Sequence, residues 1–114
     1  MHRPSVKPWI DIPQMARIVE SMVPKSLDAF VRREPELARD VLLSDDTVDR
    51  LRDSIRDELI SFMQSDPPVI PQSVDLILVA RHLERIADHA TNIAEDALFL
   101  VEGVDVRHHL QNKA

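Results

Sequence analysis

Apolar residues recur along the chain at intervals of three and four, the period of an amphipathic α-helix, in three stretches separated by prolines. The first stretch contains Ile18, Met22, Leu27 and Phe30, and Met15, Val19 and Ala29 widen it. We predict that this helix starts at Pro13, because proline suits the first helical turn. Residues 1–12, with two prolines of their own, are expected to form an extended lead-in.

Pro24 lies inside the first apolar stretch. A proline in a helix removes one backbone hydrogen bond, so it either kinks the helix or ends it. The apolar pattern resumes at Leu27, which favours a kink near Ser21 over a break.

The second stretch begins at Pro35, with acidic Glu36 in its first turn. Ser44-Asp45-Asp46 interrupts its middle, and Ser44 could cap a new helix there. A single helix through this point is the alternative, and we favour one helix from Pro35 to about Gln64. Its apolar positions are Leu37, Val41, Val48, Leu51, Ile55, Leu59 and Phe62.

Asp66-Pro67-Pro68 ends the second helix, and Pro71 or Ser73 begins the third. Two apolar rows share this helix and predict one wide buried face. Gly103 is expected to stop it, which leaves residues 104–114 as a short, frayed tail. The first row is Leu76, Ala80, Leu83, Ala87, Ala90, Ala94, Ala97 and Val101, and the second is Val79, Ile86, Ile93 and Leu100.

Three long helices with short connections predict an all-α fold, an antiparallel, spectrin-like up-down-up three-helix bundle over residues 13–103. Composition agrees, because the 114 residues include one glycine and no tyrosine, whereas a β-rich fold needs more turn glycines and aromatics. The formal net charge of −6 argues against nucleic acid as a partner. We find no signal core and no apolar run long enough to cross a membrane, so we expect a cytoplasmic protein without membrane insertion.

Acidic residues follow one strip of the third helix, where residues four and seven apart share a face. Asp46, Asp49, Asp53 and Asp57 form a second acidic row on the middle helix, and Asp45 lies four residues before Asp49. Such oxygen ligands suit hard cations and iron. Spacing alone favours the simpler interpretation, solvated faces balanced by neighbouring arginines. The strip on the third helix is Glu84, Asp88, Glu95 and Glu102.

Catalysis has no positive support in the sequence. The chain contains no cysteine, which excludes thiolate metal sites and cysteine nucleophiles. No phosphate-binding loop, dinucleotide fingerprint or nucleophile elbow occurs. His82 and His89 lie seven residues apart on one helical face, and we interpret them as structural rather than as ligands.

The segment ARHLERIADHATNIAE, residues 80–95, closely resembles the hallmark of the PhoU family. The likeness continues through residues 100–103 and 106–108. Two earlier segments agree in order, SLDAFV at residues 26–31 and DDTVD at residues 45–49. Ala87 departs mildly from the family, which usually has glycine there.

The resemblance implies a non-enzymatic adaptor that regulates phosphate uptake and phosphate-starvation signalling. PhoU proteins are thought to link a phosphate ABC transporter ATPase to a sensor histidine kinase, acting as negative regulators when phosphate is plentiful. Some members bind metals through E(D)xxxD motifs, which map here onto Glu84 with Asp88 and Asp45 with Asp49. The metal remains open among iron, zinc, manganese and magnesium.

The length departs from the family, whose members generally hold two tandem three-helix bundles. This chain resembles a single repeat, the C-terminal one, so we expect either a homodimer or a second repeat in a longer chain. Two other functions stay open beside the regulator. One is a metal-carboxylate helical protein with redox or hydrolytic activity, and the other is a structural bundle that dimerises through an exposed apolar stripe.

Overall fold

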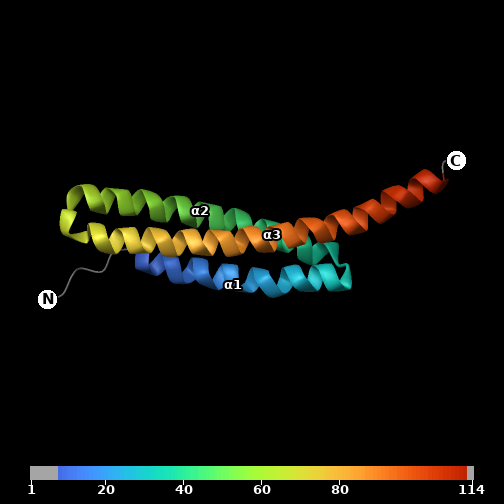
Figure 1. Cartoon of the computed structure of the whole chain (residues 1–114), viewed down its shortest axis with the longest axis horizontal. Helices are drawn as coiled ribbons and strands as arrows, with labels where there is room; N and C mark the ends of the chain where they lie inside the picture. The colour runs from blue at the N-terminus through green and yellow to red at the C-terminus, as the bar shows by residue number, and fades with distance from the viewer. Residues whose placement is uncertain (1–7, 113–114) are drawn as a thin grey trace.

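Three helices lie side by side and reverse direction at each short connection (Figure 1). The computed structural model describes the backbone of residues 8–112 and the side chains of residues 11–103. The helices are α1 (Pro8–Arg32), α2 (Pro35–Ser65) and α3 (Ile70–Asn112), and a 3-10 turn, η1 (Pro67–Val69), connects the last two. The predicted all-α, up-down-up bundle is therefore confirmed.

The start of α1 corrects the predicted lead-in. The helix begins at Pro8 rather than Pro13, so residues 8–12 are helical, and residues 1–7 lie outside the described part. Ile12 and Met15 are both buried, which means that the apolar face already starts before Pro13. The free energy gained by burying that face outweighs the loss of the one backbone hydrogen bond that Pro13 removes. Pro24 also lies inside the unbroken helix, as predicted, and the kink stays a prediction.

The end of α3 corrects the predicted stop. Gly103 does not end the helix, because α3 continues to Asn112, and the expected frayed tail is helical over residues 104–112. A glycine terminates a helix when it adopts a left-handed conformation, and Gly103 has no positive φ. As an interior residue it costs only about 1 kcal/mol relative to alanine, which a long helix tolerates.

The turn between α1 and α2 has a left-handed residue that the sequence did not signal. Arg33 has φ 56°, and the Glu34 N–H donates to the Ala29 carbonyl at 3.0 Å. This six-to-one hydrogen bond is the Schellman motif, whose left-handed position is usually glycine. Here an arginine holds it, so the only sign in the sequence was Pro35, which begins the next helix.

Replacing Arg33 with glycine is expected to raise the free energy of unfolding by about 0.5–1 kcal/mol, because glycine adopts the left-handed region without the Cβ clash. Urea denaturation monitored by circular dichroism measures the change. Arg32→Gly is the matched control, since Arg32 is helical, and it should lower stability instead. An unchanged or lowered stability for Arg33→Gly would show that the left-handed turn is not strained.

The connection between α2 and α3 is built by prolines. Asp66 donates its N–H to the Phe62 carbonyl at 2.8 Å, and Val69 donates to the Asp66 carbonyl at 3.0 Å. Pro67 and Pro68 cannot continue α2, and they form the first positions of η1. Helix α3 then begins at Ile70, one residue before the earlier of the two predicted starts.

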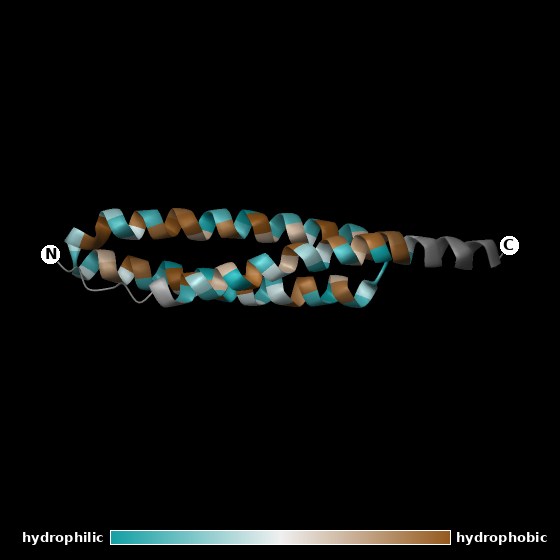
Figure 2. Ribbon diagram, turned by 90° about the horizontal axis from the view of Figure 1, so that it is seen from below, coloured by the Kyte–Doolittle hydropathy of each residue, from teal (hydrophilic) through white to brown (hydrophobic). Residues whose placement is uncertain are grey.

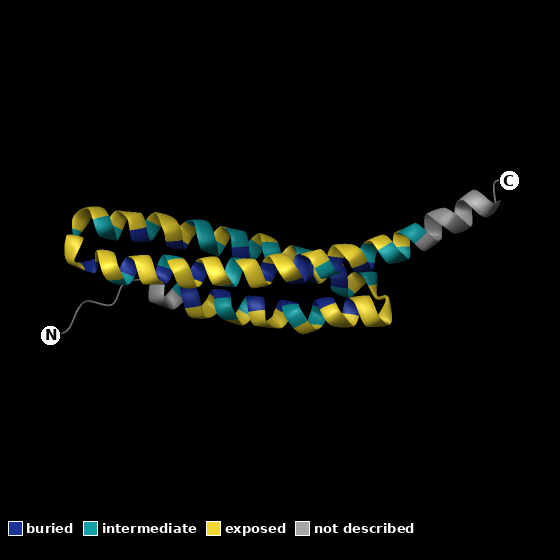
Figure 3. Cartoon of the chain, in the orientation of Figure 1, coloured by how far each residue is buried: buried dark blue, intermediate teal, exposed yellow. Residues whose placement is uncertain are grey.

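The core runs along the middle of the bundle, where all three helices meet. Buried and exposed residues alternate along each helix with the helical period (Figure 3), and hydropathy follows the same alternation (Figure 2). Helix α3 contributes mainly alanines to this core, as the first apolar row predicted. The core residues are Ile12, Met15, Val19, Met22, Ala29, Ala38, Val41, Val48, Ile55, Leu59, Leu76, Ala80, Ala87, Ala90, Ala94 and Ala97.

The second apolar row of α3 is not buried as predicted. Val79 and Ile86 are 44% and 43% exposed, and only their successors Ile93 and Leu100 are half-buried. A three-helix bundle gives α3 two neighbours, which cover one stripe rather than two. The same error affects α1, where Leu27 and Phe30 are 50% and 43% exposed. Of the predicted main stripe, Met22 is in the core, and it is joined there by Met15, Val19 and Ala29, which were expected only to widen the stripe.

Candidate carboxylate site between α2 and α3

The four carboxylates of the two acidic motifs lie along one side of the contact between α2 and α3, which run antiparallel. We call this line of contact the carboxylate seam, and define it by Asp45 and Asp49 of α2, Glu84 and Asp88 of α3, and the arginine between them, Arg52. Helical spacing puts each pair on one face of its helix. The antiparallel packing then brings the two faces together.

Arg52 connects the two helices. Its Nη1 donates to Asp49 Oδ1 at 3.2 Å and to Glu84 Oε2 at 3.3 Å, so one guanidinium nitrogen joins a carboxylate from each motif. Its Nε donates to Asp53 Oδ1 at 3.0 Å. The hydrogen bonds that Arg52 donates to Asp53 and Glu84 raise the pKa of Arg52 further above its ordinary value, which keeps the cation permanently charged. Arg52 is therefore the counter-ion of the seam.

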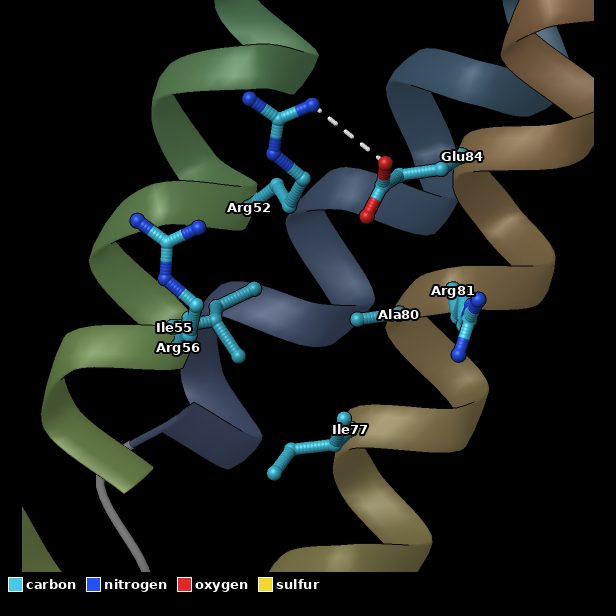
Figure 4. Close-up of a pocket in the computed structure, with 7 residues that line it drawn as sticks. All are labelled: Arg52, Ile55, Arg56, Ile77, Ala80, Arg81 and Glu84. Atoms are coloured by element: carbon cyan, nitrogen blue, oxygen red, sulfur yellow. Dashed lines mark hydrogen bonds and ion pairs between the residues drawn. The ribbon is translucent and has the colours of Figure 1, made fainter. Parts of the chain in front are cut away.

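Glu84 lies on the wall of a pocket beside this contact. Figure 4 shows the Arg52 guanidinium reaching across from α2 to the Glu84 carboxylate on α3, with Ile55, Ile77 and Ala80 below them. The pocket is about 340 Å³ in volume, and its other lining residues are Arg56 and Arg81. The Glu84 side chain is 29% exposed, so its ion pair with Arg52 is partly shielded from water.

Asp45 has the most perturbed acid–base behaviour in the seam. Burial, and then the negative charges of Asp49, Asp88 and Asp46, raise the pKa of Asp45 from 3.8 to about 6, while Arg52 lowers it. Like charges that approach each other disfavour the ionised form. The pKa of Asp45 therefore depends on carboxylates of both helices, so the two acidic motifs are electrostatically coupled.

Asp88 completes the seam from the outer side of α3. Its side chain is exposed, whereas Thr91, one turn later, is buried and donates its hydroxyl to the Asp88 carbonyl at 2.8 Å. The threonine hydroxyl is satisfied by the backbone. Its single hydrogen is therefore already used and is not available to a carboxylate of the seam.

The residue types of the seam fit a hard cation, because carboxylate oxygens are the ligands such ions prefer. Their positions do not form a coordination shell. Within the described part of the chain, no three acidic or histidine side chains converge closely enough to hold a metal ion. A cation at Asp49 or Glu84 would first have to displace Arg52.

The rest of the acidic rows is paired or spread along the surface. Asp53 pairs with both Arg52 and Arg56, and Asp57 lies 3.7 Å from Arg56. Glu95, Glu102, His82 and His89 are exposed. The expectation that arginines balance these rows therefore holds on α2. The bridging role of Arg52 was missed; its one signal is the three-residue spacing from Asp49, which leaves open whether it also reaches the other helix.

These features define a three-helix bundle with a charged seam on one side of its last helix. No helix in the described residues has the length and apolar character needed to cross a membrane. A model of the PhoU domain matches residues 12–97, and the chain therefore belongs to the PhoU family.

Several relatives are named phosphate-specific transport system accessory protein PhoU homolog. The relative from Pseudomonas aeruginosa is 41% identical over 104 residues, which are 91% of this chain and 43% of the relative. The one from Aquifex aeolicus is 43% identical over 111 residues, 96% of this chain and 50% of the relative. The crystal structure of PhoU from Pseudomonas aeruginosa is similar with a TM-score of 0.81 and 39% identity, over 88% of this chain and 47% of that one.

The chain thus spans about half the length of the relatives it matches. The predicted family and the single-bundle length agree with this comparison. The assignment to the C-terminal repeat stays a prediction.

Proposed function

We propose that the chain is a non-enzymatic accessory regulator of phosphate-specific transport, which acts as an adaptor between the transporter ATPase and a sensor histidine kinase. The observation that carries this proposal is membership of the PhoU family, whose relatives are named as accessory proteins of phosphate-specific transport. The absence of catalytic motifs from the sequence supports the non-enzymatic part. The adaptor restrains the phosphate-starvation response when phosphate is plentiful, and works in the cytoplasm, where both partners meet ATP.

Affinity purification of the tagged protein, from cells grown in high phosphate, tests the adaptor role. The ATPase subunit and the kinase are expected to co-purify. A charge-matched helical bundle of another family should retain neither. Recovery of neither partner, with the protein folded by circular dichroism, would contradict the proposal.

A second candidate function is cation binding in the carboxylate seam. The crowding that raises the pKa of Asp45 favours it, because a cation held among Asp45, Asp49, Glu84 and Asp88 would relieve the repulsion. Iron, zinc, manganese and magnesium all accept carboxylate ligands. Arg52 competes for the same oxygens, so we expect weak binding in the unaltered protein.

Arg52→Gln is expected to strengthen Mn²⁺ binding at least about tenfold, because it removes a positive charge from two of the ligands while keeping a polar side chain. Isothermal titration with Mn²⁺ measures the affinity. Arg50→Gln is the matched control, since Arg50 is exposed and its one described hydrogen bond is to Thr47.

Equal affinity in the two variants would show that Arg52 does not occupy the cation's place. If neither variant nor the unaltered protein binds Mn²⁺, iron or Zn²⁺, the cation-binding function is excluded. The adaptor proposal survives that result, because it rests on co-purification.

A further inference from the structure

The pocket between α2 and α3 has apolar walls inside and arginines at its edge. Ile55 of α2 and Ile77 and Ala80 of α3 supply the apolar walls, and the first and last of these are buried. Arg56 and Arg81 are exposed and lie on the two sides of these residues, one on each helix (Figure 4). The volume of about 340 Å³ lies at the lower end of the range for small-molecule sites. The pocket therefore suits a small molecule with an apolar body.

The sequence places an arginine beside the inward-facing residue of each helix. Ile55 is followed by Arg56, and Ala80 is followed by Arg81. Consecutive residues are about 100° apart around a helix, so a buried residue is followed by one at the edge of the interface. Because α2 and α3 pack against each other here, the two edges border the same pocket. The alanine also keeps the α3 side open, since a longer side chain at this position would occupy part of the volume.

Both of these arginines have hydrogen-bond donors to spare. Nitrogen atoms of Arg56 lie 3.6 Å from Asp53 Oδ1 and 3.7 Å from Asp57 Oδ1, ion-pair distances that are too long for hydrogen bonds. The Arg81 side chain has no ion pair and no hydrogen bond to any residue that the structure describes. A guanidinium has five N–H donors. An anion at the edge of the pocket would therefore meet donors that the described contacts leave unused.

The charge of the pocket has the opposite sign to that of the chain. Its lining holds three arginines and one glutamate, which gives +2, whereas the net charge of the chain is −6. Arg52 already pairs with Glu84 at 3.3 Å, so the excess positive charge lies with Arg56 and Arg81. Carboxylates are close by as well, Glu84 in the pocket and the aspartates that face Arg56, and they repel a second negative charge. A ligand with one negative charge therefore fits better than one with two.

We propose that this pocket binds a small organic carboxylate, with its apolar body against the isoleucines and Ala80 and its carboxylate toward Arg56 and Arg81. The apolar body gains free energy by leaving water. The guanidinium groups donate charge-assisted hydrogen bonds to the carboxylate, whose geometry they match. Both halves of the ligand are needed, because the walls offer no donor to an anion and the exposed edge buries little apolar surface. The proposal does not rest on the adaptor role, which co-purification tests separately.

Ligand-observed NMR titration of the full chain with naphthoate tests the proposal. We expect a dissociation constant below about 1 mM, which is typical of a ligand of this size. Arg81→Gln should weaken binding at least about fivefold, because it removes a positive charge and several donors from the edge of the pocket. Arg85→Gln is the matched control, since Arg85 is exposed one turn further along α3 and is not among the lining residues. Its affinity should equal that of the unaltered protein, and circular dichroism checks that both variants are folded.

Three further compounds separate the contributions of the apolar body and the charge. Naphthamide keeps the rings without the charge, and acetate keeps the charge without the rings, so each should bind at least about tenfold more weakly than naphthoate. Naphthyl phosphate, with its second negative charge, should also bind more weakly. The proposal is overturned if naphthoate does not bind, if either half alone binds as tightly, or if Arg81→Gln and Arg85→Gln have equal affinities. Tighter binding of the phosphate overturns the assignment to a carboxylate.

Discussion

Ala94→Leu is expected to lower the free energy of unfolding by about 1–3 kcal/mol, since it places three extra heavy atoms where the helices touch. Ala94 is fully buried, and its neighbours on the same face, Ala90 and Ala97, are almost completely buried as well. The added side chain can only force the helices apart or adopt an unfavourable rotamer. Against a total stability of about 5–15 kcal/mol for a domain, this loss is large.

Urea denaturation measures this effect, with Glu95→Leu as the control. Glu95 is exposed on the next position of the same helix, so leucine there should change stability by less than about 0.5 kcal/mol. Equal losses in the two variants would mean that the alanine face of α3 has room to spare, and that close approach of the helices does not depend on small side chains.

Asp45→Asn is expected to stabilise the protein above pH 6 by about 1 kcal/mol, a value reduced for the partial exposure of the side chain. The pKa of Asp45 is about 6 in the folded state and 3.8 ordinarily, because of burial and nearby carboxylates. Between those values the folded state keeps a proton that the unfolded state has released. Stability of the unaltered protein therefore falls as pH rises from about 4 to 6, and asparagine removes that loss.

Thermal unfolding at pH 4 and pH 7, in EDTA to remove metal ions, measures the difference. The Asp45→Asn variant and the unaltered protein should unfold at nearly the same temperature at pH 4, with the variant higher at pH 7. Ser44→Ala, next to Asp45 but without a titratable group, should have the same effect at both values. A stabilisation by asparagine that does not change with pH would exclude the raised pKa.

The sequence was sufficient for the number, order and type of the helices, because each depends on local signals. Pro35 and the Asp66-Pro67-Pro68 segment fixed two boundaries by removing backbone donors. The predicted start of the first helix and the predicted end of the third helix were wrong, because a local signal was given too much weight at each. A proline near the start and a glycine near the end were interpreted as boundaries, although each is tolerated inside a helix when the neighbouring residues favour it.

Burial and charge pairing were harder to predict, because both depend on neighbours that periodicity does not show. Val79 and Ile86 have core spacing, yet α3 has too few neighbours to cover them. The sequence named the pairs Asp45 with Asp49 and Glu84 with Asp88, and their role as metal ligands stays a prediction. Their spacing did not show that Arg52 lies between Asp49 and Glu84. A long side chain that reaches a second helix becomes visible only when the packing is known.

One continuous helix, α3, carries both Glu84 of the carboxylate seam and the exposed Ile86. Glu84 and Ile86 lie two residues apart on α3, which at 3.6 residues per turn places them on nearly opposite edges of the helix. Because one rigid helix holds both residues, any rotation of α3 about its axis would shift Glu84 against α2 and Ile86 against α1 together.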